Sequence, residues 1–404
     1  MLLSYHCETI GLLADGRLCN WIAEALDLEP DVIGNEIATA KSFKYADPFI
    51  VLTHDLRVLI YTSNGIPRSR FSDASLFIDI TSTLHEVIGE EIITEVLAFK
   101  EFRYQVRFAI ATKRSFSTFT VRYPYNGFAS EIKVAITSTY TLSSDINLIR
   151  TDHCRGFIRT DDGSMYALPC PFDLERFDWA AIDCDPYLVD IDNAESICEI
   201  GFNRDSAVFL RDDGSVQVYA SPDCMRAVIL PHGTHIIKAV VRDNDAFYLA
   251  ADGTCYYDTF VIYHSERVLK VTDPPVPIRS LIHKYVEDIY VLSPYLLVQH
   301  DGLKLSALVI DSWIDLAFIE GTYEPISLDY FDDKCVVDII KPYHKIFVVT
   351  DDGRVYDLEL PDTSKFNPRA RVCVTELPFF NDNPLAISSS PTNIRSARSI
   401  LKLY

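Results

Sequence analysis

The residues with the clearest potential for chemistry are the carboxylates of an Asp-Asp-Gly motif that recurs along the chain. Its clearest copy lies within residues 345–358, KIFVVTDDGRVYDL, where Asp351 and Asp352 precede Gly353. Paired carboxylates could bind Ca²⁺, but a calcium loop needs about six oxygen ligands from alternating positions. The motif offers two carboxylates and then a strand, and Asp and Gly are also preferred in tight turns. We therefore interpret the motif as turn chemistry and predict no metal site.

Two other pairs of residues have types that suit a metal site or nucleophilic catalysis. His232 and His235 lie three residues apart, but a strand is expected from about Ile236, and a zinc site needs a third ligand. Cys154 follows His153, but neighbours in a strand point to opposite faces, which separates a nucleophile from its base. The sequence has no hydrolase, metalloprotease or phosphate-loop motif. We predict no catalytic residue, no metal ligand and no cofactor, and hence a protein that is not an enzyme.

Each Asp-Asp-Gly motif sits between two short runs that alternate as strands do, which predicts a β-hairpin. In the clearest copy, residues 346–350 precede the turn and residues 354–357 follow it. A glycine with positive φ would close a type I turn at this position. Aligned on the glycine position, the copies are centred on Gly16, Leu56, Ser115, Gly163, Gly214, Gly253, Gly302 and Gly353.

The spacing of these eight copies, which ranges from 39 to 59 residues, predicts the fold class. Repeats of about 40–50 residues that contain strands throughout are typical of a β-propeller. Apolar runs such as residues 197–200, 236–241 and 336–340 come just before a hairpin, where the innermost strand of a blade would lie. We predict an all-β fold, a single β-propeller domain spanning residues 1–404. Seven or eight blades are expected, and the eight hairpins favour eight.

Both ends of the chain bear on how such a propeller would close. The first hairpin begins at once and lacks a preceding inner strand, while residues 399–404, SILKLY, alternate as a strand does. An open seam would leave a strand edge unpaired. We therefore predict that Ser399 to Tyr404 pair beside the first hairpin, near Leu2 to Leu13, so that N- and C-terminal strands close the propeller. The alternative is a basic tail, residues 393–404, that binds an anionic surface or docks on the protein itself.

The longest interval between hairpins contains a segment, residues 84–102, that supports two interpretations. Its first half has apolar residues at helical spacing from Leu84 to Ile93, which would give a helix that decorates one face and contacts a partner. The alternative is a loop followed by an inner strand from Ile93 to Phe99.

The composition and net charge of the chain argue against some classes of binding partner. The chain of 404 residues has 37 Lys and Arg against 58 Asp and Glu, a formal net charge of -21. Such a surface repels nucleic acid and anionic membranes, so we predict no nucleic-acid binding and no membrane insertion. The N-terminus lacks the pattern of a signal peptide. The 10 cysteines include no CxxC pair, which indicates free thiols. We predict an intracellular protein, cytoplasmic or nuclear and not secreted.

The repeat resembles that of the regulator of chromosome condensation family. An apolar strand, then Asp-Asp-Gly, then a strand with Val and Tyr is found in SAVFLRDDGSVQVY at residues 206–219 and in KIFVVTDDGRVYDL at residues 345–358. The resemblance spans nearly the whole chain, with degenerate repeats that lack the family's usual Trp-Gly. It implies a propeller, usually of seven blades, and in some members guanine-nucleotide exchange on small GTPases.

The pattern as a whole favours a non-catalytic function, a rigid platform or scaffold whose loops bind another protein. A propeller offers broad faces built from many loops, and the fold alone does not determine what they bind. Two alternatives are a guanine-nucleotide exchange factor for a small GTPase and a structural component of a large viral or cellular assembly. The expected partners are therefore proteins, whether a small GTPase or the subunits of a larger assembly.

Overall fold

The computed structural model divides the chain into two compact units, unit 1 (Met1–Glu195) and unit 2 (Ser196–Tyr404). Each unit contains four β-sheets. The prediction of one continuous domain over residues 1–404 stays a prediction. The structure describes residues 2–5, 8–22, 30–41, 49–61, 77–89, 91–102, 105–122, 133–151, 156–168, 186–202, 206–221, 224–242, 245–263, 268–271, 275–292, 294–310, 325–340, 345–361 and 372–386.

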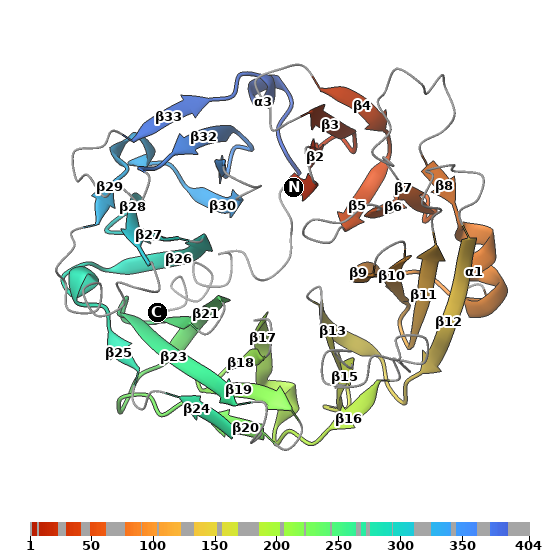
Figure 1. Ribbon diagram of the computed structural model, residues 1–404, viewed down its shortest axis with the longest axis horizontal. Coiled ribbons are helices and arrows are strands. Elements are labelled where there is room, and N and C mark those ends of the chain that lie inside the picture. Colours follow the sequence, from red (N-terminus) through yellow and green to blue (C-terminus); the bar gives the residue numbers. More distant parts are fainter. Residues whose placement is uncertain are drawn as a thin grey trace. The chain divides into compact units, whose positions relative to one another are not determined.

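In unit 1 the strands of each sheet follow one another in chain order, and each is antiparallel to the next (Figure 1). The first sheet comprises β1 (Leu2–Tyr5), β2 (Glu8–Leu12), β3 (Leu18–Ile22) and β4 (Asp31–Gly34). The second comprises β5 (Ile37–Lys41), β6 (Phe49–Thr53), β7 (Val58–Tyr61) and β8 (Phe77–Asp79). The third comprises β9 (Glu95–Phe102), β10 (Gln105–Ala111), β11 (Ser115–Arg122) and β12 (Lys133–Thr141). The fourth comprises β13 (Ile146–Thr151), β14 (Gly156–Thr160), β15 (Met165–Leu168) and β16 (Tyr187–Val189).

Unit 2 repeats this arrangement. Its first sheet comprises β17 (Ile197–Phe202), β18 (Ala207–Arg211), β19 (Val216–Ser221) and β20 (Cys224–Ala227). The next comprises β21 (Ile236–Arg242), β22 (Asp245–Ala250), β23 (Cys255–Tyr263) and β24 (Val268–Val271), and β25 (Val276–Pro277) also pairs with β23. The third comprises β26 (Val286–Leu292), β27 (Tyr295–His300), β28 (Lys304–Val309) and β29 (Ile326–Ser327). The last comprises β30 (Val336–Ile340), β31 (Ile346–Thr350), β32 (Val355–Glu359) and β33 (Cys373–Glu376).

A meander of four antiparallel strands is the blade of a β-propeller. The predicted fold class, an all-β propeller, is therefore confirmed, with eight blades divided equally between the two units. The apolar runs expected to form inner strands are confirmed as β17, β21 and β30, each at the start of its sheet.

The turns at Gly163, Gly214, Gly253 and Gly353 are type I turns closed by a glycine, as predicted. The β27–β28 loop differs, because Leu303 holds its last position and Asp301 also has positive φ. In the β14–β15 hairpin, the Gly163 amide donates to the Thr160 carbonyl at 3.0 Å, and the Thr160 amide donates to the Ser164 carbonyl at 3.0 Å. Such three-residue loops need positive φ at their last position. The five glycines predicted to have positive φ all have it, between 78° and 83°: Gly163, Gly214, Gly253, Gly302 and Gly353.

The two copies without glycine differ from each other. Leu56 keeps the turn and has a φ of 65° despite its side chain, which is 40% exposed. The prediction that Ser115 fills the glycine position is wrong, because Ser115 begins β11. There the Thr112 amide donates to the Ser115 carbonyl at 2.9 Å across a two-residue loop. The hairpin is one residue shorter, so it needs no residue at the bulge position.

Three of the described turns also form a hydrogen bond to the chain that enters the next blade. In each of them, the backbone amide of the first residue in an inner strand donates to the carbonyl of the preceding turn glycine. In unit 1 this bond runs from the Ile37 amide to the Gly16 carbonyl at 2.9 Å. Unit 2 repeats the bond from Ile236 to Gly214 at 3.2 Å and from Val286 to Gly253 at 3.0 Å. We call the chain between a blade's outermost strand and the next inner strand a linker. Turn and linker therefore lie side by side at one edge of the sheets, which we call the turn edge.

The reason given for closure through the C-terminus is wrong. The first hairpin has its own inner strand, because β1 pairs with β2 from Leu2 opposite Gly11 to Tyr5 opposite Glu8. Residues 399–404 and the alternative basic tail, residues 393–404, lie outside the described residues. Within unit 2, the Leu385 amide donates to the Gly353 carbonyl at 3.3 Å, which is the kind of bond that starts an inner strand after Gly16, Gly214 and Gly253.

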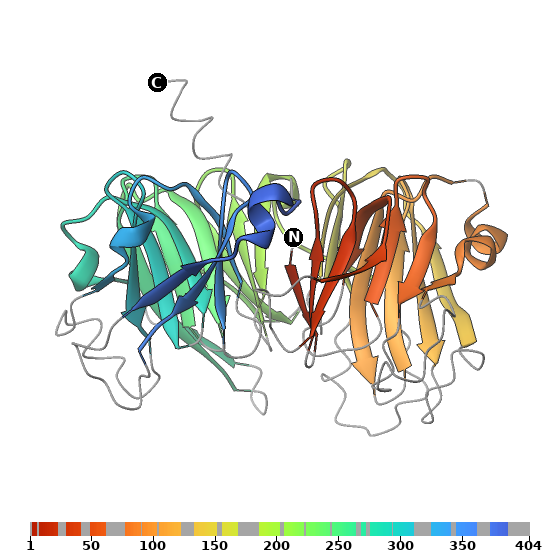
Figure 2. The ribbon, with the colours of Figure 1, turned by 90° about the horizontal axis from the view of Figure 1, so that it is seen from above.

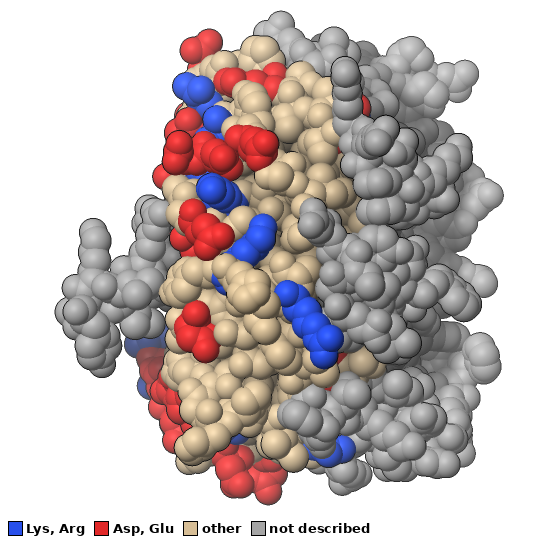
Figure 3. Space-filling view, turned by 90° about the vertical axis from the view of Figure 1, so that its left-hand side faces the viewer, with Lys and Arg blue, Asp and Glu red and all other residues tan. Residues whose placement is uncertain are grey.

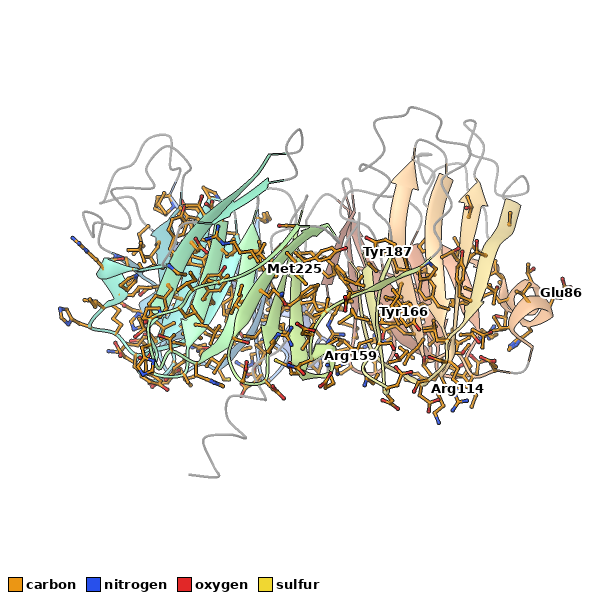
Figure 4. The ribbon with its side chains drawn as sticks, turned by 90° about the horizontal axis from the view of Figure 1, so that it is seen from below. Glu86, Arg114, Arg159, Tyr166, Tyr187 and Met225 are labelled. Carbon is orange, nitrogen blue, oxygen red and sulfur yellow. The ribbon has the colours of Figure 1, made fainter. Side chains whose placement is uncertain are left out.

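Both interpretations of residues 84–102 prove partly correct. Helix α1 (Thr81–Ile88) buries Leu84 and Ile88, and the inner strand β9 follows it. Figure 4 shows Glu86 on the outer side of α1. In the described part of the chain, no helix has the length and apolar character needed to cross a membrane.

Apolar clusters between successive sheets form the core of unit 2, whose strands stand side by side in Figure 2. The largest fully buried side chains there are aromatic: Tyr248 and Phe247 on β22, Phe209 on β18 and Tyr356 on β32. Burying such a side chain stabilises the fold by roughly 2–3 kcal/mol, so these aromatic residues contribute to the stability of unit 2.

We predict that Gly214→Ala destabilises the protein more than Gly233→Ala does. Both glycines have positive φ, which costs a non-glycine residue about 1–2 kcal/mol. An added Cβ at Gly214 would lie 2.5 Å from His235 Nδ1 and 2.8 Å from His235 Cα, whereas nothing lies within 4 Å at Gly233. Differential scanning calorimetry checks this, and equal losses of melting temperature would contradict it.

Candidate protein-binding surface

The carboxylate of the second Asp in each Asp-Asp-Gly motif bonds within its own turn. Asp162 Oδ1 accepts hydrogen bonds from the Thr160 hydroxyl at 2.7 Å and the Ser164 amide at 3.0 Å. The Thr160 hydroxyl, with Ser164 next, lowers the pKa of Asp162 to about 2. These bonds are the turn chemistry that the sequence predicts. Among the described residues, no group of three His, Cys, Asp or Glu side chains is placed to hold a metal ion.

The pair of His232 and His235 forms no metal site among the described residues. His235 lies against Gly214, and its Nδ1 is 2.9 Å from the Asp213 carbonyl oxygen. His232 is exposed on the same linker. His153 and Cys154 lie outside the described residues. The described cysteines that are free thiols are Cys19, Cys198, Cys255, Cys335 and Cys373.

One cluster in unit 2, which the sequence did not predict, has the atom types of a serine hydrolase. His300 Nε2 is 2.8 Å from Ser306 Oγ, and His300 Nδ1 is 3.1 Å from Asp301 Oδ2. His300 pairs with Lys304 across β27 and β28, and Ser306 lies two residues further along β28. Cross-strand partners and residues at i and i+2 share a face, so this register was the signal that could have revealed the pair.

The surroundings of this cluster argue against catalysis. Ser306 is 2% exposed and His300 is 4% exposed, whereas a nucleophile needs access to its substrate. Lys284 Nζ also lies 3.1 Å from His300 Nε2, the nitrogen that would take the serine proton. Burial, with the Lys284 ammonium second, lowers the pKa of His300, which weakens it as a base. Asp301 Oδ1 accepts a hydrogen bond from the Tyr285 amide at 2.9 Å. The cluster therefore holds the linker that carries Lys284 and Tyr285.

A buried ion pair joins two inner strands of unit 2. Lys238 Nζ on β21 lies 2.5 Å from Asp288 Oδ1 on β26 and 4.7 Å from the centroid of the Tyr290 ring. Asp288 also accepts from the Ile289 amide at 2.7 Å and from the Tyr290 hydroxyl at 3.1 Å. Buried charges persist where they are paired and hydrogen-bonded in this way. The pair connects two blades and offers no open ligand position on Asp288.

The linkers of unit 2 carry large apolar side chains in contact with solvent. Ile229 is 58% exposed, Ile282 57%, Tyr285 45% and Tyr330 44%. They lie on three successive linkers, before β21, β26 and β30. We call this region the linker surface: linkers 228–235, 278–285 and 328–335, with the adjacent turns 212–214, 251–253, 301–303 and 351–353. Figure 2 shows the linkers of unit 2 along a single edge of the sheets.

Contacts with neighbouring residues fix the side chains of both tyrosines of the linker surface, Tyr285 and Tyr330. The Tyr285 hydroxyl donates a hydrogen bond to the Ala251 carbonyl at 3.3 Å. The Tyr285 ring packs so closely on Gly253 that a Cβ added to this glycine would lie 2.5 Å from the ring. The Tyr330 ring packs edge-on against Phe331 and Tyr356, with centroids 5.5 and 5.6 Å away. An ordered ring loses little conformational entropy when a partner binds it. Both rings are therefore suited to be contact residues.

Acidic residues surround these apolar side chains. The turns and linkers of the linker surface hold more Asp than Lys and Arg. Figure 3 shows acidic side chains gathered along one edge of the described surface, with fewer basic ones among them. On the turn edge of unit 1, where Figure 4 shows Arg114, one acidic side chain pairs with two basic ones. There Asp145 lies 2.5 Å from Arg114 Nε and 2.6 Å from Lys113 Nζ.

Comparisons with known proteins bear on the fold. No protein-family model and no curated protein sequence matches the chain. Similar solved structures include human WBSCR16, at 13% identity over 77% of this chain and 86% of that one, with a TM-score of 0.44. Prp20p of Saccharomyces cerevisiae matches at 10% identity over 74% and 80%, with a TM-score of 0.44. The computationally designed Ika8 protein matches at 12% identity over 88% and 93%, with a TM-score of 0.49.

Prp20p is also known as yeast RCC1, and its structure was solved together with a study of its binding to Gsp1p and histones. The family that the repeats resemble is thus represented among the similar structures, as a likeness of fold. At these identities and TM-scores, the likeness transfers neither a function nor a partner to this chain.

We predict that His300 makes unit 2 sensitive to acid. Burial and Lys284 hold its folded pKa below 6.5, so the unfolded chain binds the proton more readily. The resulting stability is present above pH 6.5 and is lost as the pH falls through 6.5 toward the folded pKa. His300→Gln should therefore lose less melting temperature than the wild type between about pH 7.5 and 5.5. His232→Gln is the control, and it should keep the wild-type slope; equal slopes for all three would contradict the prediction.

We also predict that the Lys238–Asp288 pair is a structural contact. Lys238→Met leaves a buried carboxylate without its cation and should destabilise the protein by about 3 kcal/mol or more. Lys113→Met removes an ion pair whose lysine is 77% exposed and should have little effect. Chemical denaturation of both variants measures the difference. A Lys238→Met variant as stable as Lys113→Met would show that the pair contributes nothing.

Proposed function

We propose that the protein is a non-catalytic interaction platform and that the linker surface of unit 2 binds a protein partner. The observation that supports this most is the exposure of Ile229, Ile282, Tyr285 and Tyr330, between 44% and 58%, on three successive linkers. Single exposed apolar residues are ordinary, whereas groups of them mark interaction sites.

The tyrosines favour a protein partner over a small molecule. Tyrosine is enriched among the residues that carry most of the binding energy at protein interfaces. Tyr285 and Tyr330 present ordered rings on a rigid scaffold of sheets, so a partner would bind without first ordering them. The clusters that suggested chemistry, around His300 and Asp288, instead hold linkers and strands in place.

The exchange-factor and assembly interpretations differ from a general platform in the identity of the partner. A small GTPase bound at the linker surface would support exchange, and several subunits of one assembly would support a structural role. The same binding experiment therefore separates them.

We predict that Ile282→Ser combined with Tyr330→Ser abolishes capture of the partner. The tagged full chain would be used to purify binding proteins from its native source, with quantitative mass spectrometry as the readout. Loss of two contact residues should reduce the partner by at least about tenfold. Leu188→Ser is the matched control, because Leu188 is 64% exposed but lies on β16 of unit 1.

Melting temperatures should be measured first, so that a loss of capture is not a loss of fold. A partner retained equally by wild type, the double variant and Leu188→Ser would overturn the assignment of the linker surface.

A further inference from the structure

We propose that the linker surface accepts a basic segment, a stretch of partner chain in which Arg or Lys side chains alternate with aliphatic ones. This inference rests on the proposed function of the same surface and adds the chemistry of the partner. Three properties of the described residues lead to it: open carboxylates, exposed aromatic rings and exposed aliphatic side chains.

The open carboxylates are those of Asp212 and Asp351, the first Asp of the two Asp-Asp-Gly turns on the linker surface. The second Asp bonds within the turn, as Asp213 Oδ1 does with the Ser215 amide at 2.8 Å. Within the described structure, Asp212 and Asp351 form hydrogen bonds through their backbone only. The Asp212 amide donates to the Ser196 carbonyl at 2.8 Å, and the Asp351 amide donates to the Cys335 carbonyl at 2.9 Å. Among the described residues, none pairs with the carboxylate of Asp212 or Asp351. Each such turn therefore keeps one exposed negative charge available at the turn edge.

The aromatic rings add a second feature that favours cations. Lys334 Nζ lies 4.7 Å from the centroid of the Tyr330 ring, so the surface already contains one contact between a cation and a tyrosine. Tyr285 presents another ring, 45% exposed. A guanidinium or ammonium group over such a ring is attracted to the negative face of the ring, even at an exposed site. Arg suits this position best, because its planar group stacks on the ring and also bonds a carboxylate.

The linker surface also exposes aliphatic side chains, so we expect the partner segment to carry apolar side chains as well as positive charge. Ile229 and Ile282 are more than half exposed, and each lies on a linker beside an acidic turn. Burying such a side chain against a Leu or Val of the partner removes apolar surface from water and so favours binding. A segment with both basic and aliphatic side chains therefore meets every exposed feature of the surface.

The charge of the chain argues against a second copy as the occupant. Two copies with a formal net charge of -21 each would repel one another, and both would bring acidic turns to the contact. A basic partner gains attraction from the same charges, both in affinity and in the rate of association.

The test uses three short fluorescein-labelled peptides, with alternating Arg and Leu, Glu and Leu, or Arg and Ser. Fluorescence anisotropy would measure their binding to the full chain. We expect the Arg-Leu peptide to bind, the Arg-Ser peptide to bind more weakly and the Glu-Leu peptide not to bind. Tyr330→Ser and Asp351→Asn should each weaken Arg-Leu binding by about three- to tenfold.

The control variants lie on unit 1. Leu188→Ser removes an exposed apolar residue, and Glu86→Gln removes one negative charge from α1. Both should bind the Arg-Leu peptide as the wild type does. Arg-Leu binding that is equal in all variants would place the peptide elsewhere on the acidic surface and overturn the inference. Binding of the Glu-Leu peptide, or self-association of the chain that Tyr330→Ser abolishes, would also overturn it.

The two proposals fail in different ways. If Ile282→Ser with Tyr330→Ser loses the native partner but the Arg-Leu peptide does not bind, the surface is an interface whose partner has another chemistry. If the variants change neither measurement, the linker surface is not the interface and both proposals fail.

Discussion

The hydrogen bond from the first residue of an inner strand to the preceding turn glycine is the contact on which the rest of the structure depends. In unit 2 it joins Ile236 to Gly214 and Val286 to Gly253 at 3.2 and 3.0 Å. The glycine is needed twice, because its φ is positive and because the linker passes too close for a Cβ. A residue without this freedom would cost strain in the turn and would displace the next blade. One local motif thus sets both the hairpin and the position of its neighbour.

The linker surface is a consequence of this constraint. Each linker is fixed at its end by the turn, so its exposed side chains cannot fold away into the core. Tyr285 is held through its amide by Asp301 and through its hydroxyl by Ala251. The polar cluster around His300 strengthens the same linker, and burial of that histidine makes the support depend on pH. The turn edge of unit 2 therefore carries both the polar groups that fix the linkers and the apolar side chains that the linkers expose.

The repeat, the glycine turns and three inner strands could be predicted from the sequence, because they depend on local patterns of two to five residues. Ser115 could not be placed, since a hairpin one residue shorter still keeps both strands in register. The strand β1 was missed because it spans only four residues, Leu2–Tyr5, so the first hairpin looked as if it lacked an inner strand. The cluster of Ser306, His300 and Asp301 needs the register of two strands, and Lys284 reaches it from a separate linker.

The exposure of Ile282, Tyr285 and Tyr330 could not be predicted from the sequence either, because it depends on how each linker packs. In a linker of mixed polarity, Leu281 is buried and its neighbour Ile282 is exposed, and only the packing of the 3₁₀ turn (Arg279–Leu281) decides which.

Hydrogen–deuterium exchange of the full chain, alone and in complex with its captured partner, would show directly whether the linker surface binds that partner. We predict slower exchange on binding in the linkers 278–285 and 328–335, with unchanged exchange in the strands of unit 1. Slower exchange confined to unit 1 or to the outer strands, with both linkers unchanged, would contradict it.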